Sequence, residues 1–140
     1  MSYDKAKYHF DSVIEEGLPL SQAYIHTGFY LGWLIDNNLL DEEFKEDLAE
    51  SLALFTRREI TAPQLFEEFD GTLTDEELST QGNAFTKHYF DFDTGDYLED
   101  YCTHLVKDLP SEFHVKDTWE NYKIAASFIS RRYQEWLQNQ

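Results

Sequence analysis

The chain has 140 residues, of which 28 are acidic and 11 basic, giving a formal net charge of -17, and 16% are aromatic. Such a charge excludes nucleic acid and anionic lipid as partners, because both would be repelled, and the aromatic content excludes a disordered acidic tail. The single cysteine, Cys102, cannot form an internal disulfide, which indicates a reducing compartment.

The first 19 residues predict an arm packed on the body of the protein, with Gly17 and Pro19 marking a loop. They lack the basic start and apolar run of a signal peptide, and no stretch reaches the roughly 18 apolar residues of a membrane span. We therefore expect a cytoplasmic protein, with residues 1–140 forming one domain of usual size.

The segment 23–36, AYIHTGFYLGWLID, is apolar on nearly every side, with Ser21 as a candidate N-cap. A helix of this kind is typical of the centre of a fold. Gly28 and Gly32 lie four residues apart on one face, which predicts the close approach of a second helix.

Capping signals predict three further helices. The segment 44–55 has apolar residues at helical spacing and a solvated acidic face, and Gly71 suits the left-handed residue that ends the next helix. The capping residues in chain order are Asp41, Thr61 followed by Pro63, and Thr74 in a capping box with Glu77.

Two helical units follow Gly82. Residues 83–90 are helical in pattern, residues 91–97 interrupt it, and residues 97–106 resume it before Pro110. No segment shows sustained alternation with a period of two residues.

The last segment, beginning with Asp117 and Glu120 as an acidic capping box, shows the clearest amphipathic pattern in the chain, from Trp119 to Trp136. The sequence therefore predicts an all-α protein: a single compact bundle of about six helices around the central apolar helix, with little or no sheet.

Motifs for catalysis and metal binding are missing. The acidic loop from Asp91 resembles a calcium loop but has its glycine at the fifth position and Cys102 at the twelfth, so a tight turn explains it better. The five histidines show no zinc spacing, and no nucleophile motif or phosphate-binding glycine loop occurs. We expect no metal, no cofactor and no catalytic residue.

The few basic residues include two Arg pairs, Arg57 with Arg58 and Arg131 with Arg132. Guanidinium groups form bidentate bonds with carboxylates, so these pairs predict ion pairs between acidic helices. The pairs are too sparse to form a continuous basic face, which again argues against nucleic-acid binding.

Three acidic stretches, 41–50, 67–77 and 91–100, mix carboxylates with apolar residues. Exposed tyrosines with an acidic rim would suit a Lys- or Arg-rich partner, which predicts a protein-binding module. The residues expected to contact the partner are Asp91, Asp93, Asp96, Tyr97, Glu99, Asp100, Tyr101, Asp70 and Glu46.

A small enzyme or ligand-binding protein is the alternative. Its pocket would lie around the central helix and be lined by His26, Tyr30 and Trp33. A concave pocket with converging polar groups would favour this alternative, whereas a convex acidic face would favour the protein-binding module.

Four blocks covering nearly the whole chain, HTGFYLGWLID, REITAPQLFE, GNAFTKHYFDFDTGDYLEDY and HVKDTWENY, resemble an uncharacterised bacterial family of short stand-alone proteins. Because that family has no established activity or active site, the resemblance assigns no catalytic residue to this chain. Small acidic proteins of this sort resemble immunity proteins, which implies as partner a basic secreted toxin whose active site the protein covers.

Overall fold

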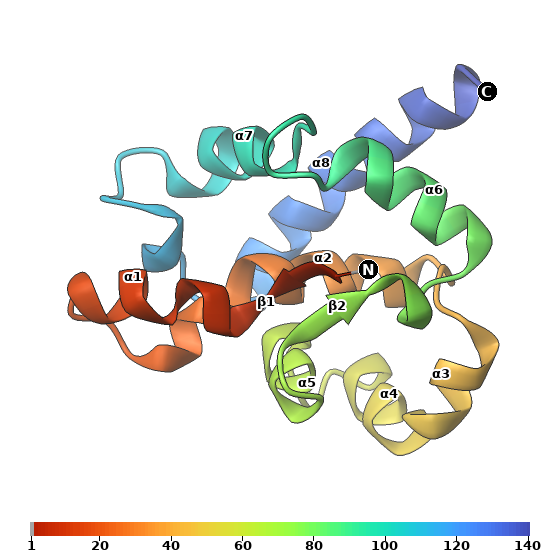
Figure 1. Cartoon of the computed structure of the whole chain (residues 1–140), viewed down its shortest axis with the longest axis horizontal. Coiled ribbons are helices and arrows are strands. Elements are labelled where there is room, and N and C mark those ends of the chain that lie inside the picture. The colour runs from red at the N-terminus through yellow and green to blue at the C-terminus, as the bar shows by residue number, and fades with distance from the viewer. Residues whose placement is uncertain (1) are drawn as a thin grey trace.

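The computed structural model describes residues 2–140 and is mostly helical, as the sequence predicts (Figure 1). The eight α-helices within this range are α1 (Phe10–Glu15), α2 (Ile25–Asp36), α3 (Glu42–Asp47), α4 (Ala49–Thr56), α5 (Ala62–Glu68), α6 (Thr80–Tyr89), α7 (Tyr97–Tyr101) and α8 (Trp119–Gln138). Short 3₁₀ segments are Ala6–His9, Leu20–Tyr24, Asp75–Glu77 and Glu112–His114, and Cys102–Val106 is a π-helical turn. Several of the α-helices have fewer than three turns, which is why they outnumber the six expected.

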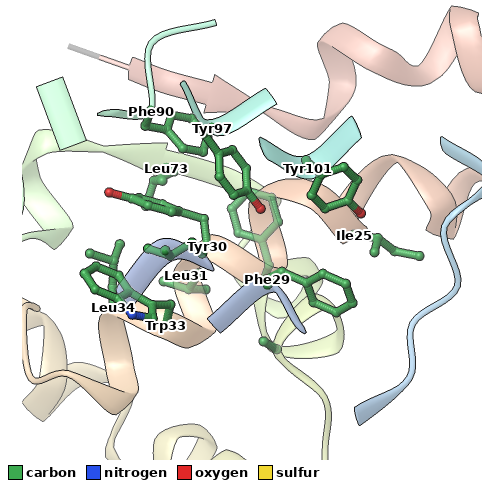
Figure 2. Packing of buried hydrophobic residues seen from close by; sticks show 14 of the residues in the cluster. Ile25, Phe29, Tyr30, Leu31, Trp33, Leu34, Leu73, Phe90, Tyr97 and Tyr101 are labelled. Atoms are coloured by element: carbon green, nitrogen blue, oxygen red, sulfur yellow. The ribbon is translucent and has the colours of Figure 1, made fainter. Parts of the chain in front are cut away.

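Helix α2 is buried over ten consecutive residues, from Ile25 to Leu34. It packs against α5 and α8, as expected of a helix that is apolar all round. Figure 2 shows Phe29 and Tyr30 of α2 close to the α7 rings of Tyr101 and Tyr97. Within residues 2–140, no helix is both long and apolar enough to cross a membrane.

The two glycines of α2 allow α5 to approach it. A Cβ atom at Gly28 would lie 2.6 Å from the Cα of Pro63, and one at Gly32 would lie 2.7 Å from the Cβ of Ala62. Both distances are shorter than real Cβ contacts, so α5 can pack here only because side chains are absent. The predicted close approach is confirmed.

Most of the predicted caps are present. The side chains of Asp41, Thr61 and Thr74 each accept a backbone N–H at a helix start, and Gly71 has a φ of +60°. Two caps, those at Ser21 and Asp117, were predicted wrongly.

Ser21 lies within the 3₁₀ segment Leu20–Tyr24, and α2 begins after it without a side-chain cap. Asp117 is also not the cap of α8. That position is held by Thr118, whose side chain accepts from the N–H of Asn121 (3.1 Å), while the Asp117 carboxylate accepts from the Thr61 hydroxyl (2.5 Å).

A small antiparallel sheet joins the N-terminal segment to the middle of the chain. Strand β1 (Ser2–Lys5) pairs with β2 (Thr72–Thr74), Asp4 lying opposite Leu73 after a bulge. The Thr27 hydroxyl of α2 donates to Oδ2 of Asp4 (2.6 Å). This bond holds β1 against the buried helix. The predicted N-terminal arm therefore packs on the body of the protein, and part of it is the strand β1.

Candidate functional site

Two of the three acidic stretches meet on one surface. A hollow of about 470 Å³ is lined by Asp41, Glu43, Phe44, Asp47, Glu76 and Glu77. The backbone N–H of Asp41 donates to the carbonyl of Glu77 (2.9 Å), and Leu40 and Leu78 form a β-bridge next to it. This backbone pairing places α3 beside the 3₁₀ segment Asp75–Glu77. We call this surface the acidic hollow.

The charge of the acidic hollow is poorly compensated. Within residues 2–140, Glu43, Asp47 and Glu76 form no ion pair. The cation on α3, Lys45, pairs instead with Glu42 (2.9 Å). Three exposed carboxylates therefore surround the partly buried ring of Phe44, which gives the hollow a negative potential and an apolar floor.

The exposed position predicted for Tyr97 and Tyr101 is wrong, since both side chains are 0% exposed. They lie four residues apart on the inner face of α7, and Figure 2 shows them within the aromatic core. The Tyr97 hydroxyl donates to the carbonyl of His26. Burial raises the pKa of both tyrosines well above the usual value. Neither can form the centre of an interface.

Asp100 is also buried and serves the fold. Its two carboxylate oxygens accept from Nε and Nη2 of Arg132 on α8, both at 2.9 Å, and Tyr89 donates to Oδ2 at 2.7 Å. Asp96 lies 3.7 Å from the same guanidinium group. The predicted ion pairing of the Arg pairs is confirmed for Arg132, and likewise for Arg58, which bonds Asp36 at 2.9 Å.

The remaining residues predicted to contact a partner are exposed, but they do not form one surface. Asp91 accepts from the backbone N–H groups of Asp93 (2.8 Å) and Thr94 (2.9 Å), the tight turn expected from the sequence. These backbone bonds lower the pKa of Asp91. Figure 1 places α7 and α3 on opposite sides of α2, so the stretch 91–101 lies far from the acidic hollow.

The other exposed members of the predicted set are Asp93 before α7, Glu99 on α7, Asp70 after α5, and Glu46 on α3. Glu46 is the one that shares a helix with the lining of the acidic hollow. Asp70 has a φ of +67° and, with Gly71, forms the turn that ends α5. This turn explains the position of Asp70.

A pocket lined by Tyr30 and Trp33 is not what the structure shows. Both side chains are 0% exposed and enclosed by other rings. The Tyr30 hydroxyl bonds that of Thr86 (2.9 Å), and Trp33 Nε1 donates to the Ser130 hydroxyl (2.9 Å). The polar atoms of both side chains therefore have hydrogen-bond partners within the core. The prediction that Tyr30 and Trp33 line a pocket is wrong. His26, the third residue predicted to line the pocket, differs because its Nδ1 has no hydrogen-bond partner.

His26 lies in a buried cluster with Asp4 and His9, three side chains from three elements. Nε2 of His9 is 2.8 Å from Oδ1 of Asp4, and Nε2 of His26 is 3.8 Å from Oδ2. One donor atom from each of the three residues lies within 4.8 Å of the others. Rings of Phe92 and Phe113 border both histidines. We call this set the Asp4–His9–His26 cluster.

The cluster holds a carboxylate and a neutral imidazole side by side. Burial lowers the pKa of His26 to about 4, although the Asp4 charge opposes this. Burial also disfavours charge on Asp4, but the His9 hydrogen bond, the two imidazoles and Thr27 outweigh it and lower its pKa. At neutral pH, Asp4 is therefore ionised and His26 uncharged.

Sequence reasoning missed this cluster. Residues 4, 9 and 26 have no spacing typical of a metal or catalytic motif, and β1 brings the first of them to α2 by pairing with a strand nearly 70 residues away. One signal was present: His26 is the single residue from Ile25 to Leu34 whose side chain ordinarily titrates near neutral pH, and all of these residues are buried.

The structure and the composition thus describe a mostly helical, acidic protein with two notable sites, the acidic hollow and the Asp4–His9–His26 cluster. The chain belongs to the DUF7832 family, a domain of unknown function, whose model matches residues 2–115. That range includes both sites, whereas α8 lies beyond it. No curated protein and no solved structure matches the chain.

Proposed function

We propose that this protein is an acidic protein-binding module that recognises a Lys- or Arg-rich surface of another protein through the acidic hollow. The observation that carries the proposal is the set of carboxylates of Glu43, Asp47 and Glu76 around Phe44, which form no ion pair among the described residues 2–140. A basic side chain would meet several carboxylates there, while its aliphatic stem would contact the ring.

The net charge of -17 supports the same conclusion. A field of this sign raises the rate at which a basic protein encounters the surface and repels anionic competitors. An immunity role against a secreted basic toxin is the biological form that we propose for this activity, with the protein covering the toxin's active site. The structure adds no support for the enzyme alternative at Tyr30 and Trp33, which are core residues.

The decisive experiment compares capture by the wild type and by a variant with a neutral hollow, Glu43→Gln/Asp47→Asn/Glu76→Gln. Tagged proteins are incubated with lysate of the source cells at low and moderate salt, and captured proteins are identified by mass spectrometry. We expect the wild type to recover a basic polypeptide that the variant loses.

A control variant with the same change in charge is Glu15→Gln/Asp108→Asn/Glu135→Gln, whose three residues are exposed, lie outside the hollow and are not among the predicted partner contacts. It should keep the partner. Equal loss from both variants would show that total charge and not the hollow determines binding, and capture of a partner without excess basic residues would refute the proposal.

Association kinetics give a second test once the partner is known. Charge-steered association slows as salt screens the field, whose Debye length falls from about 30 Å at 0.01 M to about 8 Å at 0.15 M ionic strength. We expect the association rate constant to fall at least about tenfold over this range. An unchanged rate constant would refute steering by charge.

A further inference from the structure

We propose that the Asp4–His9–His26 cluster is a binding site for a divalent transition-metal ion of the zinc type, in which these three side chains are the protein ligands. The donors are those that such ions prefer, two imidazole nitrogens and one carboxylate oxygen. This site is independent of the acidic hollow and of the function proposed for it.

The distances suit one shared ion. Ligand atoms around a tetrahedral zinc ion with bonds of about 2.0–2.1 Å lie about 3.3 Å apart. Oδ1 of Asp4 lies 2.8 Å from Nε2 of His9 and Oδ2 lies 3.8 Å from Nε2 of His26, and one donor atom from each of the three residues lies within 4.8 Å of the others. Small side-chain rotations would place the three donors around one ion.

His26 provides the second, independent observation. Its side chain is 3% exposed, its Nδ1 has no hydrogen-bond partner, and its Nε2 lies beyond hydrogen-bond distance from Asp4. A buried imidazole normally has a partner for its polar atoms. Either ring nitrogen of His26 can ligate a metal, and such a bond would give the buried ring a partner that it lacks in the core.

The protonation states are those that metal binding needs. A neutral imidazole offers a free lone pair and an ionised carboxylate an anionic donor, so neither Asp4 nor His26 must lose a proton at neutral pH. The Thr27 hydroxyl, which donates to Asp4 at 2.6 Å, orients the carboxylate from outside the ligand set.

His9 gives access to the site. Its side chain is 19% exposed, against 2% for Asp4, so an ion would enter from the His9 side and retain a position there for water. Bound metal would fasten β1 and the 3₁₀ segment Ala6–His9 to α2, in place of the Asp4–His9 hydrogen bond.

The test is a Zn²⁺ titration of the whole protein followed by NMR of the histidine ring nitrogens. Millimolar Mg²⁺ is present throughout, to occupy carboxylate-only sites on the acidic surface. We expect one equivalent of Zn²⁺ to shift the ring nitrogens of His9 and His26, and those of the exposed His88 to stay unchanged. Shifts limited to other histidines, or none, would overturn the proposal.

Variants separate a specific site from adventitious binding. His9→Gln, at the exposed side of the cluster, should weaken Zn²⁺ affinity by at least about tenfold, whereas the matched control His88→Gln should bind as the wild type does. Circular dichroism confirms that each is folded. Equal affinity in both variants would overturn the proposal.

Substitution with Co²⁺ gives a readout from the wild type alone. Tetrahedral coordination by imidazole and carboxylate produces strong visible absorption, whereas octahedral sites made of oxygen ligands absorb weakly. We expect the strong band at one equivalent, and its displacement by Zn²⁺. A weak octahedral spectrum would assign the metal to surface carboxylates and overturn the proposal.

Discussion

The Asp100 carboxylate shows how a residue that resembles a binding group can instead hold the fold together. Its charge is balanced by a bidentate contact with Arg132 and a hydrogen bond from Tyr89. Removing one partner of a buried ion pair leaves an uncompensated charge, which is more destabilising than losing both.

Arg132→Gln should therefore lower the free energy of unfolding by about 1–3 kcal/mol, because the Asp100 carboxylate is buried while the Arg132 side chain is 37% exposed. The neighbouring Arg131 is exposed, so Arg131→Gln should change that free energy by less than about 0.5 kcal/mol. Urea denaturation of both variants measures the difference, and equal effects would contradict a structural role for the Asp100–Arg132 pair.

The lowered pKa of the buried His26 ring predicts that the folded protein loses stability in acid. Its pKa falls from 6.5 in the unfolded chain to about 4 in the folded protein, so between these values the unfolded state binds more protons. The stabilisation is complete above pH 6.5 and is lost as the pH falls towards 4. At about 1.36 kcal/mol per pKa unit, the loss is on the order of 3 kcal/mol.

Urea denaturation between pH 7 and 4.5, with a chelator present, should show this loss in the wild type and a smaller one in His26→Gln, which cannot be protonated. Asp4 and His9 face the ring and remain in both proteins. His88→Gln, at an exposed position, should keep the wild-type pH dependence. Parallel curves for wild type and His26→Gln would contradict the prediction.

Among the elements, the packing of α2 on α5 depends on the missing side chain at Gly28. Alanine favours helix by about 1 kcal/mol over glycine, but here its Cβ would meet the backbone of Pro63 at 2.6 Å. We expect Gly28→Ala to destabilise the protein by about 1–3 kcal/mol.

Thermal unfolding of Gly28→Ala, with Ser127→Ala on the exposed face of α8 as control, measures this effect. A gain in stability would mean that α5 can move away at little cost, and that the glycine is not needed for packing.

Elements with strong local signals were predictable from the sequence. Helix α8 shows its amphipathic period over 20 residues, and Thr61 and Thr74 carry complete capping boxes. Strand β1 was not predictable, since four residues are too few to show a period of two and its partner is distant. The Asp4–His9–His26 cluster depends on that pairing and was missed with it.

The prediction that the tyrosines of α7 are exposed was wrong for another reason. Nearby carboxylates suggested an exposed segment, whereas the spacing of Tyr97 and Tyr101 by four residues places both on the buried face of the helix. For a helix of only five residues, the periodicity of the apolar residues was a better guide than the local density of charge.

For the whole molecule, the net charge of -17 implies repulsion between its own surface groups. Salt screens this repulsion in the folded state, where the charges are closest. We expect the melting temperature to rise between 10 and about 150 mM NaCl, where the Debye length falls to about 8 Å. Differential scanning fluorimetry measures it, and a fall would mean that attractive pairs such as Asp100–Arg132 dominate.

The contact between α2 and α8 also constrains when the protein can fold during synthesis. Helix α8 covers core residues of α2, and it leaves the ribosome after α1 to α7. Until it emerges, aromatic rings such as Trp33 lack part of their packing and Asp100 lacks Arg132. Packing of the core is therefore completed only after α8 has left the ribosome, and we expect the nascent chain to bind chaperones that recognise exposed aromatic segments until then.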